Sequence, residues 1–145
     1  GFPVYQGSRK IEDLRVSARI GGSQLKVRIA TDTDIIDPRK QRQGSSPNMI
    51  HHVDATHLMM CVNAGAAAGI GDFAMIHDDF GVHACFIDEW HKIIRTEFVN
   101  LHTNFDFLGE FKDAQEELTG LVLPDLPPSG DLNLNAVLDS PYCCG

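Results

Sequence analysis

The sequence is poor in cysteine and has no long hydrophobic run. It holds four cysteines in 145 residues, and none forms the Cys-x-x-Cys pair of a zinc site or a redox motif. The longest weakly polar stretch, residues 58–70, contains Asn63 and many small residues, and it is too short to cross a bilayer. The opening Gly1-Phe2-Pro3 has no basic or apolar signal region and no initial Met. We therefore expect no membrane partner and a processed or truncated chain.

Basic residues are also scarce, but they are concentrated at one end. The chain has 12 Lys and Arg against 20 Asp and Glu, and its formal net charge of -8 argues against a nucleic-acid-binding protein. Residues 1–42, however, hold nine basic and five acidic residues, a net charge of +4, and the remainder holds three against fifteen, a net charge of -12. This asymmetry predicts a basic surface that leads into an acidic body.

Alternating apolar and basic residues flank Gly21-Gly22. Period-two patterns on both sides of a glycine pair predict a β-hairpin over residues 14–30. One face would be apolar, and the other would carry Arg15, Arg19, Lys26 and Arg28. Periodicity alone favours a solvated face, and the alternative is a set of contacts with nucleic-acid phosphates.

A loop and then a helix are expected after the hairpin. Residues 31–46 are polar and predict a loop. Ser46 is a suitable N-cap and Pro47 suits the first helical turn, which predicts a helix over residues 47–68. Gly69 and Gly71 would end that helix.

Helices are expected to pack in the second half of the chain. Apolar residues recur there at spacings of three and four, and they predict packing helices over residues 88–118. A proline-containing C-terminal segment follows over residues 119–145. The expected fold class is therefore α+β. The apolar positions of the first packing helix are Trp90, Ile93, Ile94, Phe98 and Leu101.

Two adjacent carboxylates lie between short apolar runs. They follow His77 as Asp78 and Asp79, and the flanking runs predict a hairpin over residues 73–86 with acids near its connection. Carboxylates of like charge repel, and a bound cation relieves that repulsion. Magnesium prefers carboxylate oxygens and takes its other ligands from water and substrate phosphates. The three residues alone still favour a solvated acidic turn.

Four sequence motifs are more informative together than any one of them alone. The segment Ala-Met-Ile-His-Asp-Asp-Phe-Gly-Val-His-Ala covers residues 74–84, and Pro-Asn-Met-Ile-His-His-Val-Asp-Ala-Thr-His-Leu covers residues 47–58. Gly-Phe-Pro-Val-Tyr-Gln opens the chain, and Leu-Pro-Pro followed by Gly-Asp-Leu-Asn-Leu lies near its end. Taken in their order along the chain, the four resemble the carboxy-terminal part of single-subunit, phage-type and mitochondrial DNA-directed RNA polymerases. The resemblance spans nearly the whole chain.

The resemblance implies a fold, a reaction and partners. The chain would be the palm-proximal part of a right-hand polymerase, with a catalytic β-hairpin packed by helices. The enzyme would copy a DNA template into an RNA product from ribonucleoside triphosphates, with two Mg2+ ions. Asp78 matches the family's second catalytic aspartate, a ligand of those ions. Asp79 stands where the family has Ser, and its alternatives are a second metal ligand and a surface acid.

Other matched positions are implied to contact nucleic acid. His77 would position the turn or contact the growing RNA, and His51 matches a histidine near the template-product duplex. The alternative for His51 is a partly buried helix histidine. Asp54 and His57 lie at helical spacing, and we expect them to form a helix-stabilising network. The four basic residues of the hairpin would follow the template or product backbone.

The resemblance also implies what the chain needs from elsewhere. In that family the first catalytic aspartate and the nucleotide-binding finger helix lie upstream, so we expect the isolated chain to be inactive without the remainder of the polymerase. One alternative is a family-A-type DNA polymerase fragment, which Asp79 supports. Another is a non-catalytic nucleic-acid-binding module in which Asp78 is a turn residue. The expected location is the cytoplasm of a bacterial host, with the mitochondrion as the alternative.

Overall fold

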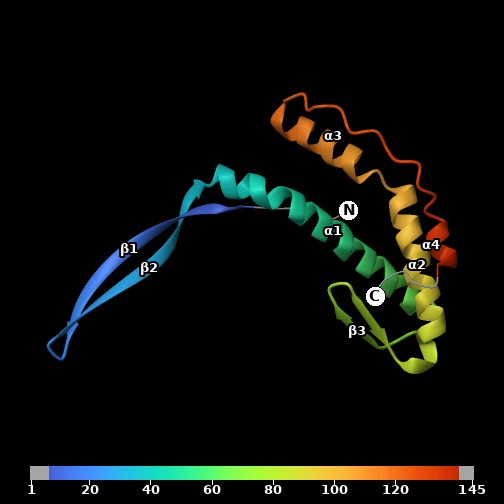
Figure 1. Cartoon of the computed structure of the whole chain (residues 1–145), viewed down its shortest axis with the longest axis horizontal. Helices are drawn as coiled ribbons and strands as arrows, with labels where there is room; N and C mark the ends of the chain where they lie inside the picture. The colour runs from blue at the N-terminus through green and yellow to red at the C-terminus, as the bar shows by residue number, and fades with distance from the viewer. Residues whose placement is uncertain (1–6, 141–145) are drawn as a thin grey trace. The chain divides into compact units, whose positions relative to one another are not determined.

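The computed structural model describes residues 7–140 as helices and two small antiparallel sheets (Figure 1). The chain divides into two compact units, residues 1–53 and residues 54–145. No helix in the described range has both the length and the apolarity needed to cross a membrane. The predicted α+β class is confirmed.

A long β-hairpin forms most of the first unit. Strand β1 (Arg9–Ile20) pairs antiparallel with strand β2 (Ser23–Ile36), so the hairpin extends beyond the predicted range at both ends. Gly21 and Gly22 connect the strands with φ values of 57° and 86°. Two central residues with positive φ are typical of a type I′ turn, and glycine adopts them without steric cost.

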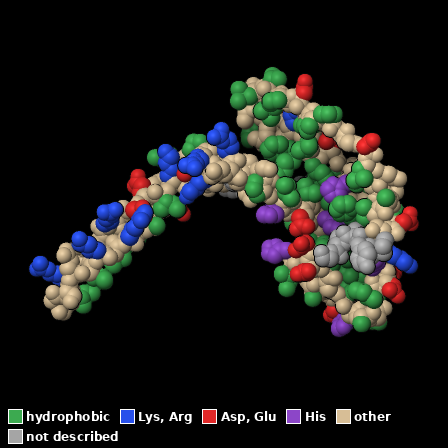
Figure 2. Space-filling view, viewed as in Figure 1, with side chains coloured by type: hydrophobic (Ala, Val, Ile, Leu, Met, Phe, Trp, Pro, Cys, Tyr) green, Lys and Arg blue, Asp and Glu red, His purple; other side chains and the backbone are tan. Residues whose placement is uncertain are grey.

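The register of this hairpin separates its side chains into two faces. Leu14 pairs with Ile29 on one face, whereas Arg15 pairs with Arg28 on the other. Directly paired residues share a face, so apolar and basic side chains lie on opposite sides. Figure 2 shows the Lys and Arg side chains along one side of the ribbon and hydrophobic ones along the other. The apolar face stays exposed, with Leu14 at 60% and Ile20 at 67%.

Helix α1 (Pro38–Ala67) begins earlier than the sequence predicted. The loop predicted over residues 31–46 is wrong, because β2 runs to Ile36 and the helix follows at once. Asp37 is the true N-cap: its Oδ1 accepts bonds from the backbone N–H groups two and three residues later, at 3.0 and 3.2 Å. Pro47 lies inside the helix, where it has no N–H to donate.

The residues that end α1 are followed directly by a core residue, Ile70. Gly69 has a φ of 91°, its N–H donates to Ala66 O at 3.1 Å, and the N–H of Ile70 donates to Gly65 O at 3.0 Å. This bonding pattern is a Schellman motif, whose glycine the sequence correctly predicted as the end of the helix. The motif turns Ile70 inward, where it is only 2% exposed.

The remaining elements belong to the second unit. The hairpin predicted over residues 73–86 ends at Val82, and a 3-10 turn occupies the last three residues of the predicted range. Asp106 caps α3 by accepting the N–H of Gly109 at 3.0 Å. The elements are β3 (Phe73–Ile76), β4 (Asp79–Val82), η1 (Ala84–Phe86), α2 (Ile87–Asn104), α3 (Phe107–Thr119) and α4 (Ala136–Asp139).

A small core lies beneath the β3–β4 hairpin. Cys61 from α1 and Trp90 from α2 are fully buried at its centre, and Ile70 and Ile94 complete it. The side chains that pack around this centre are half-buried, and most come from the hairpin. They are Phe73, Met75, Phe80, Val82, Phe86 and Ile93.

Candidate catalytic turn

Only His77 and Asp78 connect β3 to β4. The flanking residues Ile76 and Asp79 are directly paired, so the connection is a two-residue turn. His77 has a φ of 55° and is the one non-glycine residue with positive φ in residues 7–140. Two-residue turns with positive φ at the first position normally place glycine there, because a side chain costs about 1 kcal/mol. Strain of this kind is typical of functional sites.

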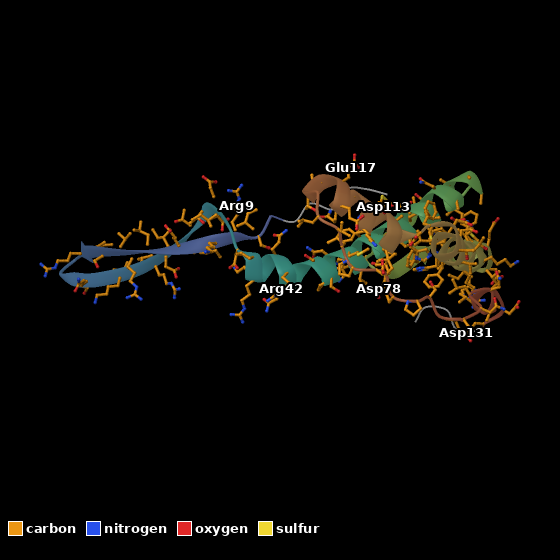
Figure 3. The ribbon with its side chains drawn as sticks, turned by 90° about the horizontal axis from the view of Figure 1, so that it is seen from above. Arg9, Arg42, Asp78, Asp113, Glu117 and Asp131 are labelled. Carbon is orange, nitrogen blue, oxygen red and sulfur yellow. The ribbon has the colours of Figure 1, made fainter. Side chains whose placement is uncertain are left out.

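The two adjacent carboxylates, Asp78 and Asp79, lie in different backbone elements. Asp78 lies in the strained connection and is exposed (labelled in Figure 3). Asp79 directly follows the connection as the first residue of β4, so both acids lie at or near it, as the sequence predicted. Neighbouring strand residues point to opposite faces, and Phe80 packs toward the core, so the Asp79 side chain points away from it. Asp79 is likewise exposed.

Phe80 fixes the hairpin to the helices beneath it. Its ring centroid lies 5.4 Å from that of His57 and 6.4 Å from that of Trp90. Its main-chain carbonyl accepts the indole N–H of Trp90 at 3.2 Å. The strands also approach closely at Gly81, where a Cβ would lie 2.9 Å from Ala74 O. The turn that carries Asp78 therefore projects from a firmly packed base.

His57 is buried, and it contacts α2 and β4. Its side chain is 6% exposed, and its Nε2 lies 3.0 Å from Ile94 O. A carbonyl can only accept, so Nε2 carries the hydrogen in this contact. The sequence predicted a network within the helix with Asp54, which is half-buried, whereas the contact observed links two helices. Burial and the neighbouring His57 lower the pKa of His102.

The other predicted nucleic-acid contacts lie in the first unit. His51 is exposed on α1. On the polar hairpin face Arg28 pairs with Asp13, which raises the pKa of Arg28 above its usual value. Within residues 7–140 no ion pair forms at Arg15, Arg19 or Lys26. The role of these residues at a template-product duplex stays a prediction.

The residues of the turn fit a partial magnesium site. Within the described part of the chain no group of three or more His, Cys, Asp or Glu side chains is placed to hold a metal. Magnesium needs only one or two carboxylates when water and substrate phosphates supply its other ligands. Exposed Asp78 and Asp79 could supply one or two. A site for two ions needs a further carboxylate from outside these residues.

The comparisons with known proteins point to one family. A family model described as DNA-dependent RNA polymerase matches residues 1–119. The chain is 35% identical over 144 residues to DNA-directed RNA polymerase 3B, chloroplastic, of Nicotiana tabacum, covering 98% of this chain and 14% of that protein. It is 40% identical over 142 residues to DNA-directed RNA polymerase 2, chloroplastic/mitochondrial, of Arabidopsis thaliana, with the same two shares. DNA-directed RNA polymerase 1B, mitochondrial, of Nicotiana tabacum is 33% identical over 144 residues. The chain thus spans about 14% of the length of these relatives.

Proposed function

The chain belongs to the family of single-subunit DNA-dependent RNA polymerases, and we propose that it forms the palm-proximal, carboxy-terminal part of such an enzyme. In this proposal the enzyme joins ribonucleoside triphosphates into RNA on a DNA template. The observation that carries it is the β3–β4 turn. A strained two-residue connection presents an exposed Asp78 from a buried base, within a segment that the polymerase family model matches.

Asp78 would act as a metal ligand in nucleotidyl transfer. Mg2+, when bound, would lower the pKa of the attacking RNA hydroxyl and offset the charge that develops on the phosphate. The task of the protein is to hold the carboxylate at one position, because displacement by about 1 Å can cost a hundredfold in rate. Asp79 points away from the core in the first position of β4, which favours a supporting role.

The basic face of the β1–β2 hairpin would contact nucleic-acid backbone. Lys and Arg bind phosphates with a strength that falls as salt rises. Asp13 already pairs with Arg28, so the cations of that face that form no ion pair within residues 7–140 would contribute most: Arg15, Arg19 and Lys26. The opposite, apolar face has no charge to offer a phosphate.

The family match disfavours the two alternatives considered for this chain. A DNA polymerase fragment rests on Asp79 alone, and a non-catalytic module gives no reason for the strain at His77. The relatives are named as chloroplastic or mitochondrial proteins. Those names support the mitochondrial alternative for the location of this chain over the cytoplasm of a bacterial host.

A chimeric polymerase tests the role of Asp78. Residues 1–145 would replace the matching segment of the Arabidopsis thaliana relative, which is 40% identical over 142 residues. Template-dependent RNA synthesis by the chimera should fall about a thousandfold in Asp78→Asn, because a metal ligand contributes several kcal/mol to the transition state.

Asp79→Asn is the matched control for that variant. It removes one carboxylate from the adjacent position, and it should change the rate by less than about tenfold. An Asp78→Asn chimera that keeps a tenth of its activity would contradict the proposal. The isolated 145-residue chain should show no synthesis under the same conditions.

A further inference from the structure

Trp90 occupies the centre of the core beneath the catalytic turn. Its side chain is 0% exposed, and its ring centroid lies 5.4 Å from that of Phe73. α1 makes room for it at Gly65, where a Cβ would lie 2.7 Å from Trp90 Cζ3. The indole therefore packs against α1 at Gly65 and against side chains from both strands of the hairpin, Phe73 and Phe80.

The polar atom of this indole reaches the main chain of the hairpin. The Trp90 N–H donates to Phe80 O at 3.2 Å, and Phe80 follows Asp78 by two residues. In a hairpin closed by a two-residue turn the flanking pair, here Ile76 and Asp79, exchanges hydrogen bonds. The next pair, Met75 and Phe80, does not, so the Phe80 carbonyl points outward from the two-stranded ladder. Trp90 supplies the donor that this carbonyl needs.

We propose that Trp90 is a positioning residue for Asp78, acting through its hydrogen bond to the Phe80 carbonyl. The inference rests on the proposed role of Asp78 as a metal ligand. A core that required only volume at this position could use a hydrocarbon side chain. The strained φ of His77 instead requires surroundings that over-determine the backbone, and a directional bond two residues beyond Asp78 provides them.

A pair of variants in the chimeric polymerase separates positioning from packing. Trp90→Phe keeps a ring but removes the donor. Phe73→Leu, the control, loosens the packing on the same indole but leaves the bond to Phe80, because Phe73 pairs with Val82 at the far end of the hairpin.

Only loss of the Trp90 N–H donor should change the Mg2+ dependence of the rate. We expect Trp90→Phe to lower kcat about tenfold and to raise several-fold the Mg2+ concentration that gives half the maximal rate. The KM for nucleotides should stay within about twofold, because ground-state nucleotide binding is not the step affected. Phe73→Leu should leave the Mg2+ dependence unchanged. Equal changes in both variants, or an unchanged Mg2+ dependence in Trp90→Phe, would overturn the proposal.

A second measurement needs no activity. Trp90 is the one tryptophan of the chain, so its indole N–H gives a single signal in the nuclear magnetic resonance spectrum of the 145-residue protein. That N–H should exchange with deuterium at least about tenfold more slowly than free indole. The backbone amides of Asp79 and Phe80 should exchange faster in Trp90→Phe than in Phe73→Leu. An unprotected indole, or amides that respond equally to both changes, would refute the bond as a positioning device.

The proposed roles of Asp78 and Trp90 can be refuted separately. A chimera that stays active with Asn at position 78 refutes the proposed function, whatever Trp90 does. A chimera that depends on Asp78 but uses Mg2+ equally well with Trp or Phe at position 90 refutes only the inference about Trp90.

Discussion

Residues 7–140 contain two antiparallel hairpins, and these differ in length, turn and packing. β1–β2 is long, turns through Gly21 and Gly22 without strain, and leaves its apolar face exposed. β3–β4 has four residues in each strand, turns through a strained His77, and packs its apolar side chains on a buried Trp90. The hairpin whose turn is strained is therefore the one whose strands pack on a buried core.

This difference shows where the chain stabilises its backbone. Nearly every residue of the β1–β2 hairpin is exposed, so burial within residues 7–140 contributes little to its stability. An isolated two-stranded hairpin is at best marginally stable in water. The β3–β4 hairpin can hold a residue with positive φ because aromatic rings and an indole hydrogen bond fix its base. A metal ligand needs a fixed position, and Asp78 lies on the hairpin that provides one.

Truncating a core-facing side chain of the β3–β4 hairpin should have the largest effect on the free energy of unfolding. Phe80→Ala should lower the free energy of unfolding by about 3 kcal/mol, because it leaves a cavity beside Trp90 and His57. Val16→Thr on the exposed face of β1 should change it by less than about 0.5 kcal/mol. Urea unfolding followed by circular dichroism measures both. Equal losses would mean that the apolar face of β1–β2 is packed as well as the core.

Exchanging turn chemistry between the hairpins should have a smaller effect. His77→Gly should raise the free energy of unfolding by about 1 kcal/mol, because glycine adopts positive φ without strain. Gly22→Ala, where only the φ of 86° opposes the new methyl group, should lower it by a similar amount. Thermal unfolding of the two variants tests the pair. A loss of stability in His77→Gly would show that the histidine side chain, not the backbone, determines that turn.

The smallest effect should be an acid-side loss of stability that depends on His102. Burial and His57 lower the pKa of His102 below its ordinary 6.5, so the unfolded chain binds that proton more readily than the folded one. This contribution is complete above about pH 6.5 and is lost as the pH falls from there toward the lowered pKa. The midpoint of thermal unfolding should therefore fall less between pH 7 and pH 5 in His102→Gln. An identical pH dependence in both proteins would contradict the assignment.

Much of this architecture follows from local patterns. The period-two alternation around Gly21-Gly22 predicted a hairpin with an apolar and a basic face, and the register has both. The apolar spacing from Trp90 to Leu101 predicted α2, and Gly69 correctly predicted the end of α1. In each case the signal and the structure involve residues that are neighbours in sequence.

Two near-identical signals explain the main error. Asp37-Pro38 and Ser46-Pro47 each combine an N-cap residue with a proline suited to the first turn. The predicted helix begins at the second, because the polar residues 31–46 favour a loop. The structure uses the first, since the Asp37 carboxylate meets two N–H groups of the helix.

The packing of the candidate site could not be predicted from local patterns. The helical spacing of Trp90 placed it on the apolar face of α2, but nothing in that pattern gives its bond to Phe80 O. In the same way His57 was expected to pair within its own helix, and its contact with Ile94 O depends on how two helices pack. Contacts between distant segments arise from tertiary packing, which spacing does not encode.

Localised backbone cleavage by iron is the most direct test of metal binding at Asp78. Fe2+ can replace Mg2+ at a carboxylate site, and with ascorbate and peroxide it generates radicals that cut the nearby backbone. In the chimeric polymerase we expect cuts within residues 76–80, suppressed by excess Mg2+ and absent in Asp78→Asn. Cuts elsewhere in the chain with this turn intact, or cuts at the turn that persist in Asp78→Asn, would contradict metal binding at Asp78.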